Sequence, residues 1–361
     1  MTTGTEPAPP TTGLPRPRAR VESHRRLPRF AGAGLFGLGI LGGVLLAALT
    51  GAGVVLAVVY GVVLGILAVY VVSRRVEGSR KALDRLMTCV VTTAFGLAMV
   101  PLLSLVYTVL DRGLRRLDGT FFNSSMLGIV GEGGGAYHAI LGTLIITALT
   151  ALISVPIGLL TAIYLVEYGT GRLKKAITFL VDVMTGIPSI VAGLFAFALF
   201  ALIFGPGIRL GVMGAVALSV LMIPVVVRSS EEVLKLVPNE LREASYALGV
   251  PKWRTVLKVV VPTAIAGLAT AVTLAVARVI GETAPLLITV GIINGTNLDP
   301  FHGRMATLPV FAFYQLTQPG FPPEVAIDRA WTAALLLIML VMALNVVARL
   351  ISRFFAPTTG R

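Results

Sequence analysis

Charged residues are scarce in this sequence. Asp, Glu, Lys and Arg together make up 13% of the 361 residues, whereas soluble domains usually carry about 25%. So little charge cannot cover the surface of a water-soluble globule, and that class of protein is excluded. Cysteine is nearly absent too. The single Cys89 rules out a disulfide framework and a cysteine-based metal site.

Motifs for chemistry on a substrate are also missing. The sequence contains no G-x-x-x-x-G-K-[ST] phosphate-binding loop, so we expect the chain to have no ATPase site of its own. It has no Ser/His/Asp set and no metal-ligand spacing, and His138, Asn294 and Gln315 are better explained as interfacial side chains. We therefore expect that the chain is not an enzyme by itself and binds no cofactor or metal.

Long apolar runs are what the sequence has in abundance. It is 56% hydrophobic with a mean hydropathy of +0.89. The runs at 30–49, 53–72, 86–110 and 330–350 reach the roughly 20 residues that a helix needs to cross a bilayer. Because lipid cannot hydrogen-bond to the backbone, such runs must be helical. The predicted fold class is an all-α integral membrane protein.

The basic residues predict how the helices are oriented. In a soluble protein a net charge of +13 would suggest nucleic acid as a partner. Here the positive-inside rule explains the excess, because Lys and Arg cluster between apolar runs, and we expect no nucleic-acid partner. Both termini are predicted to be cytoplasmic. The eight predicted transmembrane spans are about 30–50, 53–72, 86–110, 138–167, 176–204, 210–228, 263–290 and 329–351.

The connections between these spans divide into two kinds. Residues 73–85 and 229–262 are rich in Lys and Arg and are predicted to be cytoplasmic, whereas 111–137 and 295–327 are predicted to be external loops. Residues 1–29 are rich in Pro, Thr and Arg without apolar periodicity. They are predicted to form a disordered basic cytoplasmic tail.

The long polar stretch 229–262 contains a spaced motif. Glu243 and Ala244 stand six and five residues before Gly249, and Pro262 follows thirteen residues after that glycine. A short helix with a bend that glycine permits can present one face to a soluble partner and transmit a rigid-body motion. The simpler interpretation is an ordinary amphipathic connection between two spans.

This motif resembles the cytoplasmic loop by which permease subunits of ABC importers dock on their ATPase. The usual form of that loop is E-A-A, three residues, G, nine residues, I-x-L-P. Three positions of this sequence depart from it, with Ser245 in place of the second Ala and Val259 and Val261 in place of Ile and Leu.

Arg278 and Glu282 lie inside an apolar run and share one helical face at i and i+4 spacing. A charge near the bilayer centre costs about 2.5–3.5 kcal/mol, so each needs a partner or a watery path. One interpretation is a structural ion pair between the two. The other is that Arg278 donates in a planar, bidentate manner to an anion crossing the membrane, while Glu282 tunes or gates that charge.

Two further charges lie at the ends of predicted spans. Arg228 ends the span 210–228, and the default interpretation is a side chain that snorkels to the cytoplasmic surface. Asp182, near the start of the span 176–204, is expected to have a structural role.

Four sequence blocks are similar to phosphate-transport permeases of the PstA type. The blocks are 185–193, 224–232, 236–238 and 277–286, and the similarity extends from about 80 to 354. It implies a six-helix type I ABC importer permease core within a domain 73–361. The transmembrane hairpin 30–72 is an addition to that core, and its role is not implied by the resemblance.

The resemblance also implies a function and partners. The chain would form half of the pathway of an ATP-driven inorganic phosphate importer in the bacterial cell membrane, with Arg228 in the anion path. Its partners would be a permease of the PstC type, two ATPase subunits of the PstB type that hydrolyse ATP with Mg²⁺, and an extracytoplasmic phosphate-binding protein of the PstS type.

Other functions remain open at this point. Arginines bind any small oxyanion, so only the local motifs distinguish a phosphate permease from a permease for sulfate or molybdate. A stand-alone ion-coupled transporter predicts inverted repeats and no docking loop. A structural membrane scaffold leaves Arg278 and Glu282 unexplained.

Overall fold

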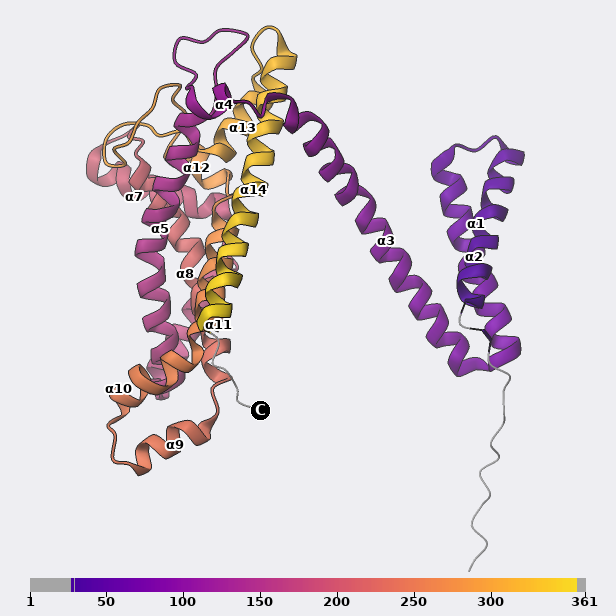
Figure 1. The fold of residues 1–361 in the computed structure, drawn as a ribbon, viewed down its shortest axis with the longest axis horizontal. Coiled ribbons are helices and arrows are strands. Elements are labelled where there is room, and N and C mark those ends of the chain that lie inside the picture. Colours follow the sequence, from indigo (N-terminus) through magenta and orange to yellow (C-terminus); the bar gives the residue numbers. More distant parts are fainter. Residues whose placement is uncertain (1–26, 29, 356–361) are drawn as a thin grey trace, which may run out of the picture. The chain divides into compact units, whose positions relative to one another are not determined.

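The computed structural model describes residues 27–28 and 30–355, and for residues 351–355 it describes the backbone alone. The predicted tail 1–29 therefore lies outside the described residues except at 27 and 28. Throughout the described part the regular structure is helical, as predicted. The chain divides into two compact units, residues 1–104 and 105–361, and each is described by itself (Figure 1).

The first unit begins with a helical hairpin. Helix α1 (Ala31–Thr50) and helix α2 (Val54–Glu77) are joined by a turn in which Gly51 has a φ of 67°. The two helices pack at glycines: a Cβ added to Gly43 would lie 2.1 Å from the backbone nitrogen of Gly61. Only residues without a side chain allow backbones to approach this closely.

Helix α3 (Ser79–Gly113) follows almost without interruption, because only Gly78, with a φ of 88°, separates it from α2. The predicted non-membrane connection 73–85 is thus helical except at this glycine. Lys and Arg are good helix formers, so a helix continues from the apolar run into the basic segment. The cytoplasmic position of this segment stays a prediction.

The second unit is built around long helices that pack on one another (Figure 1). Helix α5 (Tyr137–Ile163) continues into a π turn, η2 (Tyr164–Tyr168), and packs against α8 (Gly211–Lys235). Helix α11 (Val261–Val279) contacts both α8 and α14 (Pro323–Phe355). The largest buried core lies among α5, α8, α11 and the short helix α12 (Ala284–Thr289).

The predicted span 176–204 is bent. The structure has two helices, α6 (Gly171–Thr185) and α7 (Ser189–Phe204), which meet at an angle of 107°. The break falls at Gly186-Ile187-Pro188. Proline disfavours a helical residue before it and lacks an N–H, so α6 ends before this tripeptide and α7 begins after it.

The predicted span 263–290 is also displaced. Helix formation starts earlier, with α10 (Lys252–Thr255) and the π turn η3 (Val256–Val260), and α11 ends at Val279. A break at 280–283 separates it from α12, where Pro285 stands in the first turn. The predicted external loop 295–327 contains the additional helix α13 (Leu308–Thr317), and the loop 111–137 contains α4 (Gly119–Asn123).

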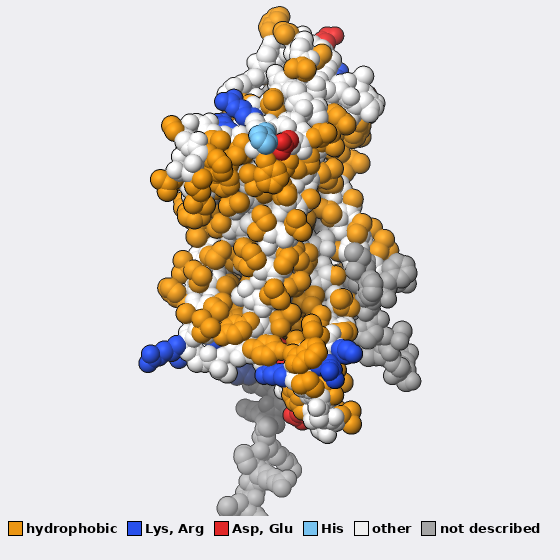
Figure 2. All heavy atoms as spheres, turned by 90° about the vertical axis from the view of Figure 1, so that its left-hand side faces the viewer, with side chains coloured by type: hydrophobic (Ala, Val, Ile, Leu, Met, Phe, Trp, Pro, Cys, Tyr) orange, Lys and Arg blue, Asp and Glu red, His pale blue; other side chains and the backbone are white. Residues whose placement is uncertain are grey.

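Seven described helices are long and apolar enough to cross a membrane, and the bent pair α6–α7 raises that number to eight if it is counted as one span. This agrees with the predicted eight. The second unit carries a broad hydrophobic belt with Lys and Arg along its lower edge and a smaller group of them above it (Figure 2). Excluding the hairpin α1–α2, the candidate spans are α3, α5, α6–α7, α8, α10–α11 and α14.

Candidate functional site

A small cavity lies where three of these elements meet. Its volume is about 210 Å³. The break between α6 and α7, the middle of α8 and the end of α11 contribute its walls. The lining residues are Met184, Thr185, Ile187, Ser189, Leu221, Pro224, Val225, Arg278 and Glu282. Three of the four sequence blocks noted above thus converge on one site.

Prolines shape the walls of this cavity. Pro188 precedes α7, so the helix begins at Ser189, which lines the cavity. The first backbone N–H groups of a helix have no intrahelical partner and carry partial positive charge. Pro224, in the middle of α8, has no N–H to donate to the preceding turn. Broken helices of this kind direct backbone dipoles at ions inside membranes.

Arg278 and Glu282 both line the cavity, but not as neighbours on one helical face. Arg278 is in the last turn of α11, and Glu282 lies in the turn beyond it, where its N–H donates to the carbonyl of Val279 at 3.1 Å. Among the described residues, no ion pair or hydrogen bond joins the two side chains. The structural ion pair considered above is therefore not formed here, and both charged groups face the same cavity.

Arg228 has a different environment. Its guanidinium donates to Glu231 at 2.9 Å and to Asp182 of α6, and Lys235 donates to the same Glu231 at 2.8 Å. Arg228 lies one helical turn beyond Pro224 on α8. It thus connects α8 to the bent helix pair, and Asp182 is the acceptor on the other side.

The predicted docking motif forms a helical element at one end of the second unit (Figure 1). Helix α9 (Asn239–Ala247) carries Glu243 and Ala244 on its exposed surface. Gly249 follows with a φ of 75°, a left-handed conformation that favours glycine. Pro262 stands in the first turn of α11, so the four motif residues bracket one continuous segment.

Side-chain contacts hold this segment in place. The hydroxyls of Ser245 and Thr255 are 2.8 Å apart, so the serine that departs from the usual motif bonds to α10. Arg242 donates to Glu167 of the π turn η2 at 2.8 Å and to the carbonyl of Val237 at 2.6 Å. The side chains of Arg242 and Glu167 are only 13% and 4% exposed.

Apolar side chains around α9 remain uncovered. Leu236 and Leu248 are 80% and 83% exposed, and Trp253 is 54% exposed. Apolar surface beside a rigidly held helix is typical of a protein-protein contact.

Sequence reasoning missed the pair of Arg242 and Glu167 as well as the hydroxyls of Thr185 and Ser189. Glu167 ends a long apolar run, and an acidic residue in that position is a signal that could have been followed. Its partner is 75 residues away, and no spacing rule connects them.

Comparison with known proteins gives three findings. A family model described as "Binding-protein-dependent transport system inner membrane component" matches residues 154–361. The phosphate transport system permease protein PstA 1 of Mycobacterium tuberculosis (strain ATCC 25618 / H37Rv) is 45% identical over 294 residues, which cover 81% of this chain and 94% of the relative. The phosphate transport system permease protein PstA of Mycobacterium leprae (strain TN) is 44% identical over 280 residues, covering 76% and 90%.

A solved structure shares the fold. A chain from the crystal structure of a bacterial alginate ABC transporter, in complex with an alginate pentasaccharide-bound periplasmic protein, matches with a TM-score of 0.55 and 12% identity. The match covers 76% of this chain and 96% of that chain. At this identity the likeness concerns the helical fold alone.

Proposed function

This chain belongs to the family of binding-protein-dependent transport system inner membrane components, and from that premise we propose that it is the permease subunit of an ATP-driven inorganic phosphate importer. It forms half of the translocation pathway. The observation that carries the proposal is the convergence of Arg278, Glu282 and the α6–α7 break on one cavity. The 45% identity to a mycobacterial phosphate permease supports phosphate as the anion.

The cavity suits a small tetrahedral anion. The guanidinium of Arg278 donates two parallel hydrogen bonds to an oxyanion. Ser189 adds a hydroxyl, and the first turn of α7 adds backbone N–H groups, whereas the Thr185 hydroxyl donates to the carbonyl of Val181 at 2.9 Å. Glu282 keeps the net charge of the site low, so that the anion binds weakly enough to move on.

Arg228 gives the anion a second contact on its way. In this structure Asp182 and Glu231 occupy its guanidinium. Movement of α6 relative to α8 separates Asp182 from Arg228 and frees donors for the anion. The two arginines thus act in sequence, with Arg278 first and Arg228 nearer to the cytoplasm.

ATP hydrolysis is the work of partner subunits. Two cytoplasmic ATPases of the PstB type, using ATP and Mg²⁺, grip α9 at Glu243 and Ala244 and at the exposed leucines beside them. Arg242 passes the motion to Glu167 of η2, the turn that continues α5. A permease of the PstC type completes the pathway, and a phosphate-binding protein of the PstS type supplies it. The chain itself has no enzymatic step, and both its termini are cytoplasmic.

Two other functions are less well supported. A permease for sulfate or molybdate would use the same donors, and no contact in the cavity favours those anions over phosphate. An ion-coupled secondary transporter has no ATPase partner, so this function does not explain the docking helix.

The proposal is tested by replacing the cavity arginine in the complex reconstituted with its partners. Arg278→Ala is expected to abolish phosphate uptake while the ATPase subunits still co-purify. Arg278→Lys keeps the charge but loses bidentate donation and is expected to transport poorly. Arg172→Ala, at an exposed arginine of α6 outside the cavity, is the matched control. Full uptake in Arg278→Ala would return this arginine to a structural role.

A further inference from the structure

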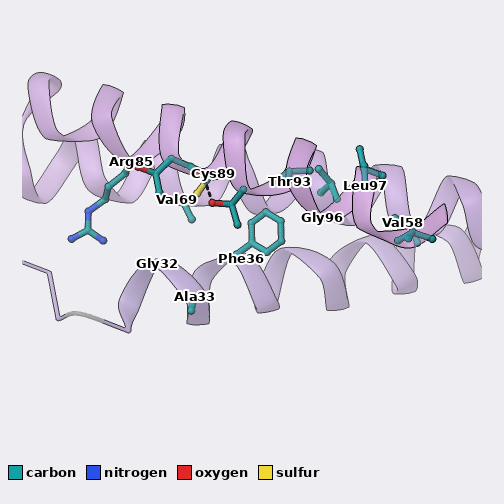
Figure 3. A pocket seen from close by; sticks show the side chains of 14 residues that line it. Gly32, Ala33, Phe36, Val58, Val69, Arg85, Cys89, Thr93, Gly96 and Leu97 are labelled. Atoms are coloured by element: carbon teal, nitrogen blue, oxygen red, sulfur yellow. Dashed lines mark hydrogen bonds between the residues drawn. The ribbon is translucent and has the colours of Figure 1, made fainter. Parts of the chain in front are cut away.

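A second cavity lies within the first unit and shares no lining residue with the cavity at Arg278 and Glu282. It has a volume of about 670 Å³ and is lined by residues of α1, α2 and the first half of α3. Most of the lining is apolar, with Phe36 on α1, Val62 and Val69 on α2, and Leu97 on α3. Arg85 stands at one end of the cavity, and Val58 and Leu97 lie toward the other end (Figure 3).

Two of the three threonine hydroxyls along the α3 wall are hydrogen-bonded within the helix. Thr88 donates to the carbonyl of Asp84 at 2.9 Å, and Thr92 donates to the carbonyl of Thr88 at 2.7 Å. Both are therefore occupied by their own helix. The third threonine, Thr93, has a buried hydroxyl without a hydrogen-bond partner among the described residues, and the Cys89 thiol and the bare backbone of Gly96 line the same wall.

At the end of the cavity near Arg85, charged side chains are held by hydrogen bonds. Glu77, whose side chain is 3% exposed, accepts from Nε of Arg85 at 2.7 Å and from Nη2 at 3.0 Å. Ser73 and the backbone N–H of Leu27 also donate to this carboxylate, at 3.0 and 2.8 Å. Arg85 is thus fixed in one orientation, and among the described residues its Nη1 has no hydrogen-bond partner.

A second, polar hollow adjoins this end. Leu27, Glu77, Lys81, Asp84 and Arg85 line it. The hollow itself balances two cations, Lys81 and Arg85, against two carboxylates, Glu77 and Asp84. The surrounding segment 73–85 has five basic and two acidic residues, and this excess of positive charge favours an anion nearby. An apolar groove beside a cluster of Lys and Arg complements an anionic phospholipid, because the groove matches the apolar acyl chain and the basic cluster matches the charged head group.

We propose that this groove binds one acyl chain of an anionic glycerophospholipid, whose head-group phosphate lies against Nη1 of Arg85 and the ammonium of Lys81. Basic pockets between transmembrane helices bind anionic head groups in this way. From Arg85 to Val100 the α3 wall is about 22 Å long at 1.5 Å per residue. One leaflet of the roughly 30 Å hydrocarbon core is about 15 Å thick, so the groove accommodates a chain of that leaflet.

The experiment uses the purified full-length chain in vesicles that contain phosphatidylglycerol or phosphatidylcholine with a photoreactive acyl chain. Labelled peptides are mapped by mass spectrometry. We expect residues 88–100 to be labelled roughly twenty-fold more by phosphatidylglycerol than by phosphatidylcholine, since two cations face the head group. Lys81→Gln is expected to lower labelling about five-fold.

Matched variants distinguish a specific lipid-binding site from non-specific electrostatic attraction of anionic lipid to the basic segment. Arg80→Gln removes a neighbouring charge that lines neither hollow, and it is expected to leave labelling unchanged. Gly96→Leu fills the groove, because a Cβ there meets nothing within 4 Å, and it is expected to abolish labelling of 88–100. Gly37→Leu, at an equally open glycine of α1 outside the groove, is the control.

Three results would overturn the proposal. Equal labelling by the two lipids would mean that bulk lipid fills the groove. An equal loss in Arg80→Gln and Lys81→Gln would mean that only the summed charge matters. Loss of labelling when the partner permease is reconstituted with the chain would assign the groove to a helix of that partner.

Discussion

The contact between Arg242 and Glu167 allows a quantitative prediction about the docking helix. Arg242→Ala removes a guanidinium that donates to a carboxylate of which 4% is exposed, and that also donates to the carbonyls of Leu234 and Val237. Glu167 is then left buried without its cation. Breaking a buried pair by removing one partner costs about 3–5 kcal/mol.

That cost is expected to appear as local opening of α9. Arg242 is the link between this helix and the end of α5, so the lost free energy favours states in which α9 detaches. At about 3 kcal/mol, the opening equilibrium changes roughly 150-fold. Hydrogen exchange of the backbone amides of α9 is expected to accelerate by about that factor.

The assay is hydrogen exchange followed by mass spectrometry on peptides covering 236–250. Arg254→Ala is the matched control, because Arg254 stacks on Trp253 at 5.2 Å and is exposed. Exchange in this control is expected to match the wild type. If Arg242→Ala left the protection of α9 unchanged, the pair would not anchor the helix, and the proposed transmission from α9 to α5 would be refuted.

Three more predictions concern other parts of the chain. Gly43→Leu is expected to separate α1 from α2, because the leucine side chain would occupy the position of the Gly61 backbone. Cross-linking between cysteines placed on the two helices measures this separation, and an unchanged yield of cross-links would contradict the prediction. Gly249→Ala forces a non-glycine residue into a left-handed conformation at a cost of about 1–2 kcal/mol, and the thermal unfolding temperature of the reconstituted complex should fall. Hydrogen bonds from the Thr120 hydroxyl and the backbone N–H of Phe121 lower the pKa of Asp118, the N-cap of α4. A lowered folded pKa means that the cap contributes stability at neutral pH and loses it as the pH falls through that pKa; Asp118→Ala, at a cost of about 1 kcal/mol, should remove this acid dependence from the hydrogen exchange of α4.

Much of the helical fold is predictable from the sequence because lipid imposes simple requirements. Apolar length places α1, α2 and α5 to within a few residues of the predicted spans. The break between α6 and α7 is marked by Gly186 and Pro188, yet the angle of 107° is not. That angle depends on contacts between distant segments, such as Gly193 against Pro285, where an added Cβ would lie 2.6 Å from the proline Cα.

The site was only partly predictable for the same reason. The cost of charge in lipid singles out Arg278 and Glu282, and both do line one cavity. Their helix ends at Val279, however, although the apolar composition continues to about 290. Apolar composition indicates that a segment lies in the membrane, but it does not show that the backbone leaves the helix at 280–283. The prediction that Arg278 and Glu282 share one helical face was therefore wrong.

The central claim is tested most directly by ion uptake into vesicles that contain this chain with its partner permease, the two ATPases and the binding protein. The account predicts ATP-dependent accumulation of labelled phosphate that exceeds accumulation of labelled sulfate under the same conditions. Uptake that is independent of ATP would contradict the importer, and sulfate uptake equal to or above that of phosphate would contradict the substrate.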